Sequence, residues 1–299
     1  MLSPTQIVLL LVLGLLAFVV FDPKRLPELG NSVGRAIQEF KKASASSPVG
    51  TSGHRGTTTE TSRSWAVGPL VAFDTETTGV DVETDRIVAA YLGDGSTSDL
   101  SWLVDPGIAI PAEATAVHGI TTDEVRAHGR PAAEAIGEIV DALARALAAA
   151  IAVVTYNAAF DFTVLDRECH RYGLQTLEDR LGRPVSPVVD PWVLDKHVDR
   201  YRSGHRTLPD VCQVYRVRLV EAHDARGDAL AALGVARALA KGYPEVAVLS
   251  PNALHELQVG AAREQAASFA AYLERKGVVA REVGGDWPVK PFPPPKVSR

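Results

Sequence analysis

Short apolar runs alternate with helical patterns along residues 65–276 of this chain. Residues 70–73 and 151–154 are uninterrupted apolar runs, which is typical of buried strands. Residues 160–172 and a segment from Asp224 to about Lys241 predict helices, and a third helix is predicted from about Pro251 to Lys276. Strands followed by helices in this order indicate an α/β fold.

Acidic residues follow the first apolar run directly. Asp74 and Glu76 stand at its end, and side chains two positions apart on a strand share a face. These two carboxylates therefore point the same way, whereas Thr75 points to the opposite face. Adjacent carboxylates repel one another unless a cation lies between them, and Mg²⁺ and Mn²⁺ prefer carboxylate and water oxygens. The pattern predicts a metal site; the alternative is a solvated acidic turn.

Two further blocks place polar side chains where helices begin. Asp161 lies near the start of the helix that follows the second apolar run, where it either binds metal or favours the positive end of the helix dipole. Asp224 is a predicted N-cap, which places Asp228 one turn inside the next helix. His223 precedes that helix, either as part of the site or as a surface histidine. We expect these groups to converge on the carboxylates of the first block around a pair of metal ions.

The three blocks resemble the three motifs of the DEDDh family, the 3′–5′ exonucleases similar to the epsilon proofreading subunit of bacterial DNA polymerase III. Residues 110–121 resemble the family's substrate-side loop, and residues 207–212 resemble its helix before the third motif. The resemblance covers about residues 65–245. It implies a ribonuclease-H-like α/β fold in which helices flank a mixed five-stranded sheet. The residues that match the motifs are Asp74, Glu76, Asp161, His223 and Asp228.

The resemblance also implies a two-metal phosphodiesterase. Asp74, Glu76, Asp161 and Asp228 would bind two ions, Mg²⁺ or Mn²⁺, which activate a water and stabilise the leaving 3′-oxygen. His223 would take the proton from that water, a task that suits imidazole at neutral pH. The expected substrate is a nucleic acid with a free 3′ end, single-stranded and made of DNA, with RNA as the alternative. The residues expected to bind it are Thr77, Thr78, Gly79, His118, Gly119, Asn157 and Phe160.

Composition adds bounds rather than chemistry. The chain has 299 residues, of which 46% are hydrophobic, so it can hold one or two domains with a core, and its net charge of −5 gives no general attraction to nucleic acid. Cys169 and Cys212 lie in helical patterns and predict buried thiols in a reducing cytosol, without a disulfide or zinc site. One basic cluster predicts either a local nucleic-acid contact or a solvated loop. It consists of Arg200, Arg202, His205 and Arg206.

The N-terminus carries a different pattern. Residues 7–21 are apolar and uncharged, shorter than the roughly 20 residues of an ordinary spanning helix, and end at Asp22-Pro23. Apolar residues at helical spacing then predict an amphipathic helix that lies along an interface. A secretory signal peptide is the alternative, but basic residues follow the apolar stretch instead of preceding it. The positive-inside rule therefore predicts membrane contact through residues 5–42 and a cytoplasmic catalytic domain anchored at the inner face of the cell membrane.

Residues 1–45 resemble the A/E-type subunit of the twin-arginine protein translocase, through residues 21–30 and 34–42. The segment departs from the family pattern at Asp22, which replaces the glycine of the family hinge. The backbone freedom that glycine gives is lost at this position. The segment is interpreted as a translocase component, as an anchor alone, or as a fusion of two reading frames. Polymerase and translocase partners are hypotheses that no docking motif supports.

Four parts follow along the chain. Residues 1–42 form the membrane segment, 43–64 a flexible linker rich in Ser, Thr and Gly, 65–245 the exonuclease domain, and 246–299 a helix with a Pro-rich tail. The C-terminal helix is expected to pack on the nuclease core, or alternatively to bind a partner. The segment from Trp287 to Arg299 is expected to fray.

Overall fold

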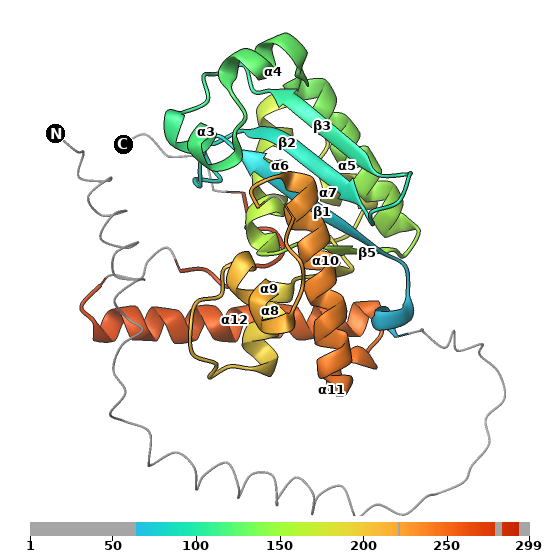
Figure 1. Cartoon of the computed structure of the whole chain (residues 1–299), viewed down its shortest axis with the longest axis vertical. Coiled ribbons are helices and arrows are strands. Elements are labelled where there is room, and N and C mark those ends of the chain that lie inside the picture. The colour runs from blue at the N-terminus through green and yellow to red at the C-terminus, as the bar shows by residue number, and fades with distance from the viewer. Residues whose placement is uncertain (1–63, 221, 279–282, 293–299) are drawn as a thin grey trace, which may run out of the picture. The chain divides into compact units, whose positions relative to one another are not determined.

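The computed structural model describes residues 64–220, 222–278 and 283–292 (Figure 1). The predicted membrane segment and residues 43–63 of the predicted linker lie outside the described residues. The elements in chain order are the 3₁₀ helix η1 (Trp65–Val67), β1 (Leu70–Thr77), β2 (Ile87–Gly93), β3 (Leu100–Asp105), α3 (Ala112–His118), α4 (Thr122–His128), β4 (Arg130–Pro131), α5 (Ala132–Ala148), β5 (Ala152–Val154), α6 (Ala158–Tyr172), α7 (Leu177–Leu181), β6 (Val188–Val189), α8 (Pro191–Val198), α9 (Leu208–Tyr215), α10 (Ala225–Gly242), α11 (Pro244–Ala247) and α12 (Pro251–Arg275).

A mixed sheet with strand order β4-β3-β2-β1-β5-β6 forms the centre of residues 64–292. β2 pairs antiparallel with β1 and β3, whereas β5 is parallel to β1 and to β6, and β4 is parallel to β3. The predicted α/β fold with helices flanking a mixed sheet is confirmed. The sheet has six strands where five were expected. Its two edge strands, β4 and β6, have two residues each, too few to leave a recognisable hydrophobic pattern.

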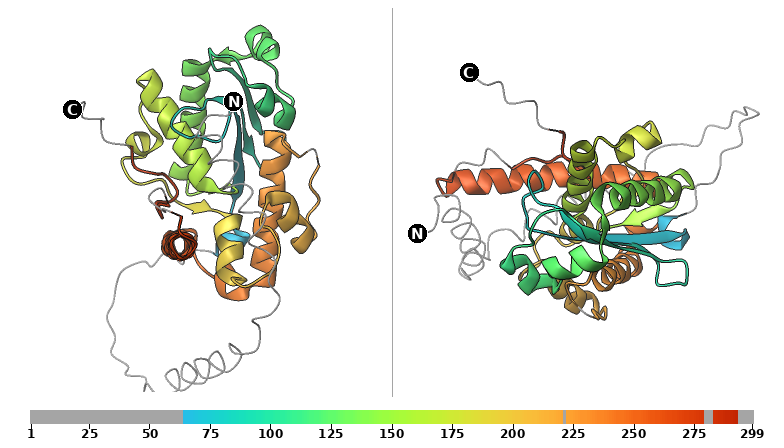
Figure 2. Two further views of the ribbon diagram at one scale, coloured as in Figure 1. Left: turned by 90° about the vertical axis from the view of Figure 1, so that its left-hand side faces the viewer. Right: turned by 90° about the horizontal axis from the view of Figure 1, so that it is seen from above.

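Helices cover both faces of the sheet, which is seen edge-on in the left view of Figure 2. Phe73 of β1 and Val153 of β5 belong to the core beneath α5 and α6. Ala72 and Val154, each one position away, belong to the core beneath α10. Because side chains alternate along a strand, the even-numbered residues of β1 face α10 and the odd-numbered residues face α6. This alternation decides where the carboxylates at the end of β1 point.

The C-terminal helix α12 closes the β6 edge of the sheet. His255 Nδ1 accepts a hydrogen bond from the Val188 backbone N–H at 3.2 Å. The Gln258 side chain donates to the Val188 carbonyl at 2.9 Å and accepts from the Asp190 N–H at 2.6 Å. An open strand edge presents unpaired backbone groups, and these two side chains satisfy them. Of the two interpretations of this helix, the structure therefore supports packing on the nuclease core.

The tail that follows α12 packs against the domain. Trp287 is 8% exposed, and its indole N–H donates to Asp190 Oδ2 at 3.1 Å. The Arg167 guanidinium donates to the carbonyls of Lys290 and Pro291, at 3.2 and 2.8 Å. The expectation that the tail frays from Trp287 onward is therefore wrong for residues 287–292, because a buried indole and hydrogen-bonded carbonyls hold them. Residues 293–299 lie outside the described residues.

Two predictions about polar groups have different outcomes. Cys169 and Cys212 are free and buried, as predicted, and burial raises the pKa of the Cys212 thiol to about 11. The basic cluster divides: Arg200 and His205 are exposed, as in the solvated-loop alternative, whereas the other two members fit neither alternative. Arg202 and Arg206 both form ion pairs with Asp195, a fully buried carboxylate, so these two guanidinium groups hold the α8–α9 connection in place.

Candidate active site

The carboxylates of β1 lie on the side of the sheet that α10 covers. Asp74 and Glu76 follow Ala72 at even positions, and Ala72 belongs to the α10 core. Asp228 is in the first turn of α10. One oxygen from each of these three side chains lies within 4.8 Å of the other two. The first and third sequence blocks therefore meet, as the resemblance to the exonuclease motifs implies.

Burial and mutual repulsion disfavour the charged form of these acids. Burial raises the pKa of Asp74 well above its ordinary value, and repulsion from Asp161 and Glu76 raises it further. Burial, followed by repulsion from Asp228 and Asp161, raises the pKa of Glu76 to about 8. Burial also raises the pKa of Asp228. Removal of this electrostatic penalty requires either protons or a cation between the carboxylates.

The donor set fits a hard divalent cation. Asp228 Oδ2 accepts a hydrogen bond from the His223 backbone N–H at 3.3 Å, whereas its Oδ1 is buried and has no hydrogen-bond partner within the described part of the chain. A buried carboxylate oxygen without a donor is costly unless a ligand supplies the missing interaction. Three clustered carboxylates with such an oxygen match the oxygen ligands that Mg²⁺ and Mn²⁺ prefer.

Asp161 is held beside this cluster by β1 itself. β5 pairs with β1 only as far as Val154, opposite Ala72. Beyond Ala72, this edge of β1 pairs with no strand of the described residues. There the Thr75 backbone N–H and hydroxyl both donate to Asp161 Oδ1, at 3.0 and 2.7 Å. Thr75 thus points away from its two acidic neighbours, as predicted, and its hydroxyl binds the second block. Asp161 is outside the 4.8 Å group but close enough for its charge to raise the pKa of Asp74 and Glu76.

His223 lies in the turn before α10, as its spacing from Asp228 predicts. It is exposed, with a positive φ of 67°, and Asp224 after it is the N-cap, accepting from the Gly227 N–H at 3.0 Å. His118 ends α3, and its pKa is lowered by burial and to a smaller extent by the charge of His223. The two imidazoles therefore lie close enough for their charges to interact.

Hydrogen bonds join the Thr77-Thr78-Gly79 segment into a tight turn. The Thr77 hydroxyl donates to the Gly79 carbonyl at 2.6 Å, and the buried Thr78 hydroxyl donates to Asp85 Oδ1 at 2.9 Å. A Cβ on Gly79 would lie 2.5 Å from the Asp85 carboxylate, so glycine is required by this close approach. The structure thus gives Thr78 and Gly79 a role in the turn that follows the β1 carboxylates.

The other residues expected to contact substrate occupy element ends. Gly119 is the left-handed C-cap of α3 with a φ of 78°, and His118 Nδ1 accepts from the Ile120 N–H at 3.1 Å. His118 Nε2 is buried without a hydrogen-bond partner among the described residues. Asn157 is exposed at the start of α6, whereas Phe160 is half-buried and packs against the core. A hydrogen-bonding interaction with the Thr77 backbone opposes the fall in the His118 pKa, so this imidazole lies beside the end of β1.

Sequence reasoning missed Asp190. This carboxylate is fully buried and accepts hydrogen bonds from the backbone N–H groups of Asn157, Ala158 and Trp192, at 3.0, 2.9 and 2.9 Å. Burial raises its pKa, and these hydrogen bonds oppose the rise. The available signal was an Asp followed by Pro at Pro191, an N-cap pattern for α8. Nothing in that pattern indicates that the same carboxylate also binds the start of α6.

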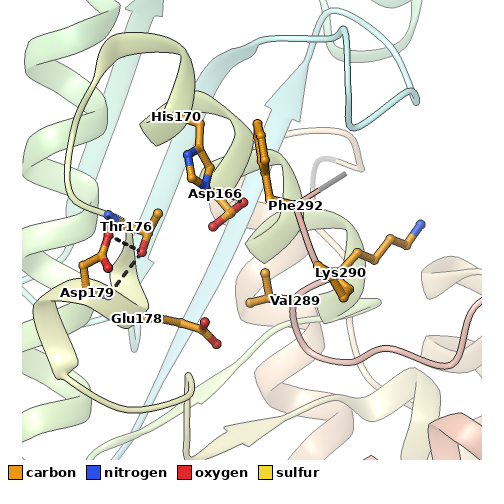
Figure 3. Close-up of a pocket in the computed structure, with 9 residues that line it drawn as sticks. Asp166, His170, Thr176, Glu178, Asp179, Val289, Lys290 and Phe292 are labelled. Carbon is orange, nitrogen blue, oxygen red and sulfur yellow. Dashed lines mark hydrogen bonds and ion pairs between the residues drawn. The ribbon is translucent and has the colours of Figure 1, made fainter. Parts of the chain in front are cut away.

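One cavity of about 420 Å³ lies between α6, α7 and the C-terminal tail (Figure 3). Its walls include Asp166, His170, Asp179 and Lys290. None of the predicted site residues lines it, so it is separate from the carboxylate cluster.

Comparison with known proteins bears on two parts of the chain. Residues 71–236 match the Exonuclease family (RNase_T). An uncharacterised exonuclease of Escherichia phage 186 is 31% identical over 119 residues, which are 40% of this chain and 58% of the phage protein. DNA polymerase III subunit epsilon of Treponema pallidum is 29% identical over 165 residues, 54% of this chain and 71% of that protein. The chain thus spans little more than half the length of the phage relative.

A solved structure supports the fold. E. coli exonuclease I, in a complex with a dT13 oligonucleotide, superposes with a TM-score of 0.51 at 18% identity, over 59% of this chain and 42% of that chain.

Residues 4–47 match the mttA/Hcf106 family. The Sec-independent protein translocase protein TatA of Maridesulfovibrio salexigens is 54% identical over 39 residues, 13% of this chain and 62% of that protein. The resemblance of the N-terminal segment to the A/E-type translocase subunit is therefore confirmed. Within the described residues, no helix has the length and apolar character that crossing a membrane needs. The predicted membrane segment falls outside them.

Proposed function

Because the chain belongs to the Exonuclease family through residues 71–236, we propose that it is a metal-dependent 3′–5′ exonuclease that releases nucleoside monophosphates from DNA. The observation that carries the proposal is the convergence of Asp74, Glu76 and Asp228, whose oxygens lie within 4.8 Å of one another. Glu76 and Asp228 raise the pKa of Asp74, and Asp228 raises that of Glu76, so the charged forms of this cluster are costly to the fold. Divalent cations bound between the carboxylates would offset this cost.

The chemistry divides among the residues as follows. Asp74, Glu76 and Asp228 would hold Mg²⁺ or Mn²⁺, and Asp161 would complete the ligand set from the side of Thr75. Two such ions, when bound, would supply Lewis-acid activation of a water and stabilisation of the leaving 3′-oxygen. An imidazole nitrogen of His223 accepts the proton of the attacking water. Hydrolysis gives a nucleoside 5′-monophosphate and a strand shortened by one nucleotide, with a new 3′-hydroxyl.

The residues that we assign to substrate binding lie near the ends of helices and strands. Thr77, Gly119, Asn157 and Phe160 lie at the ends of β1, α3 and α6, and His118 Nε2 has no partner within the described residues. We assign to them the binding of the terminal nucleotides. The name of the Treponema relative, a DNA polymerase III subunit, favours DNA, and the oligonucleotide bound by E. coli exonuclease I suggests a single strand.

The direct test is incubation of the purified protein with single strands labelled at the 5′ end and, separately, at the 3′ end, in Mg²⁺, Mn²⁺ or EDTA. We expect stepwise shortening from the 3′ end, release of labelled mononucleotide from the 3′-labelled strand, and no reaction in EDTA. If both strands stay intact in Mg²⁺ and in Mn²⁺, the proposal is wrong. RNA strands of the same sequence decide between the two sugars.

The N-terminal segment supports a second proposal, membrane attachment. Its match to the mttA/Hcf106 family favours contact of residues 5–42 with the inner face of the cell membrane, with the exonuclease on the cytoplasmic side. Cell fractionation tests it, since full-length chain should pellet with membranes and a chain starting at residue 43 should not. Rescue of protein export by residues 1–45, in cells lacking the A-type subunit, would add a translocase function.

A further inference from the structure

The start of helix α6, which carries Asp161, lacks a cap of its own. Asn157 occupies the N-cap position with a left-handed φ of 64°, and its side chain makes no capping hydrogen bond. The first N–H groups of a helix have no partners within the helix. Here Asp190 supplies them from outside, because its Oδ1 accepts from the Asn157 N–H at 3.0 Å and its Oδ2 from the Ala158 N–H at 2.9 Å.

The C-terminal segment in turn holds Asp190. The Trp287 indole N–H donates to Asp190 Oδ2 at 3.1 Å, and the Gln258 side chain accepts from the Asp190 backbone N–H. Asp190 is fully buried, so each donor to its carboxylate matters to where that carboxylate lies. Trp287 and Gln258 both lie beyond residues 71–236, the part that matches the exonuclease family.

The same tail grips α6 further along. The Lys290 N–H donates to the Thr163 hydroxyl at 3.0 Å, and Arg167 donates to two tail carbonyls. Figure 3 shows Phe292 beside His170, with ring centroids 4.0 Å apart. Trp287 acts on the helix start through Asp190, one turn before Asp161, whereas Lys290 binds the helix after Asp161. The Phe292 contact lies on the outer side of the helix and has no link to Asp190 among the described contacts.

We propose that Trp287 is a positioning residue for the exonuclease site, because its hydrogen bond to Asp190 fixes the first turn of α6 and thereby the place of the Asp161 carboxylate. This inference rests on the proposed function of the site. It makes the C-terminal segment part of the catalytic unit. The segment also covers the sheet edge through α12.

Trp287→Phe tests the inference, because phenylalanine keeps an aromatic ring near His255, whose ring centroid is 4.9 Å from that of Trp287, and lacks the N–H donor together with the rest of the second indole ring. We expect kcat to fall about tenfold with little change in KM for the strand, and the Mg²⁺ concentration for half-maximal activity to rise. Hydrogen exchange at the Asn157 and Ala158 amides should quicken. Phe292→Ala, the matched control in the same tail, should leave all three quantities at the wild-type values.

The outcomes separate the inference from the proposed function. A Trp287→Phe protein that loses only thermal stability, with wild-type kcat, Mg²⁺ dependence and exchange, would overturn the positioning role. Loss of activity in Phe292→Ala to the same degree would overturn it as well. If the wild type degrades no strand, the proposed function fails, and exchange at the two amides together with Mn²⁺ affinity still decides the inference. Asp190→Asn provides the same readouts if Trp287→Phe does not fold.

Discussion

Two acidic sites, at the ends of two strands that lie on either side of β5, differ in how the protein accommodates negative charge. At the end of β1, the carboxylates of Asp74, Glu76 and Asp228 lie close together, and the charge of Asp228 raises the pKa of the other two. One buried oxygen of Asp228 has no partner among the described residues. At the end of β6, Asp190 is more deeply buried, yet four N–H groups donate to it at 3.1 Å or less. The fold itself stabilises the Asp190 carboxylate with hydrogen bonds, whereas the repulsion within the β1 cluster needs a bound ligand to offset it.

The comparison teaches that hydrogen-bond satisfaction, rather than burial or residue type, separates a structural carboxylate from a functional one. A satisfied acid should contribute to stability and only indirectly to activity. An unsatisfied cluster should contribute to activity and cost stability. Substitutions at the two sites should therefore have opposite effects on these two properties.

The largest effect is expected for Asp74→Asn. We expect exonuclease activity to fall by about 10³-fold or more. The variant lacks a carboxylate that binds metal and, through the metal, stabilises the charge of the transition state. In EDTA the variant should unfold at the same temperature as the wild type or at a higher one, since one repelling charge is gone. Rate assays and thermal melts check the two halves; a melting temperature well below wild type would break the contrast between the sites.

His223→Asn should have the next largest effect. Asparagine tolerates the positive φ of 67° at this position, so the substitution removes the imidazole without straining the turn. We expect kcat to fall about 10²-fold or more through loss of the proton acceptor. Because His223 is exposed, the denaturant midpoint should stay at the wild-type value. A kcat unchanged from the wild type would remove His223 from the mechanism.

Asp190→Ala should reverse the pattern seen with Asp74. Several backbone N–H groups at the starts of α6 and α8 lose their acceptor inside the protein, so the free energy of unfolding should fall by about 3 kcal/mol. Urea denaturation measures the loss. Addition of Mg²⁺ should not restore it, because Asp190 lies outside the metal cluster. A stability equal to that of Asp74→Asn would show that hydrogen-bond satisfaction does not separate the two sites.

Local periodicity predicted the parts of the β1 cluster, and the family resemblance predicted that these parts meet. The strand period placed Asp74 and Glu76 on one face and Thr75 on the other, and the N-cap at Asp224 placed Asp228 in the first turn of α10. The α/β class followed from the apolar runs that became β1 and β5 and from the helical patterns that follow them. The mixed sheet, and the approach of Asp228 to the two β1 carboxylates, were implied by the resemblance alone.

The second site could not be predicted in this way, because its partners are distant in sequence. The donors to Asp190 come from residues 157–158, 192 and 287. Arg202 and Arg206 bind Asp195 from the connection between α8 and α9, where neither the helical nor the strand period applies. The tail reads as Pro-rich and polar, and only the fold shows that Trp287 has a buried acceptor. Long-range hydrogen bonds leave no mark on local hydrophobic patterns.

A metal-dependent pH profile of stability is the smallest expected effect. The folded protein holds a proton on Glu76 up to about pH 8, whereas an ordinary glutamate loses it near 4.5. Between these values the folded state binds more protons than the unfolded chain. In EDTA this contribution to stability is therefore fully present below pH 4.5 and is lost as the pH rises through 8.

Saturating Mg²⁺ should flatten this dependence, since the cation stabilises the charged carboxylates and binds only the folded state. Thermal melts from pH 5 to 8.5, with and without Mg²⁺, measure it, and the gain from Mg²⁺ should grow with pH. Glu76→Gln should reduce that growth. Glu168→Gln is the matched control, because burial raises the pKa of Glu168 to about 7 but this residue lies outside the cluster, so the Mg²⁺ effect should persist. If the melting temperature of the wild type depends on pH equally with and without Mg²⁺, the β1 cluster binds no cation in this pH range. The repulsion between its carboxylates would then not reflect a metal site.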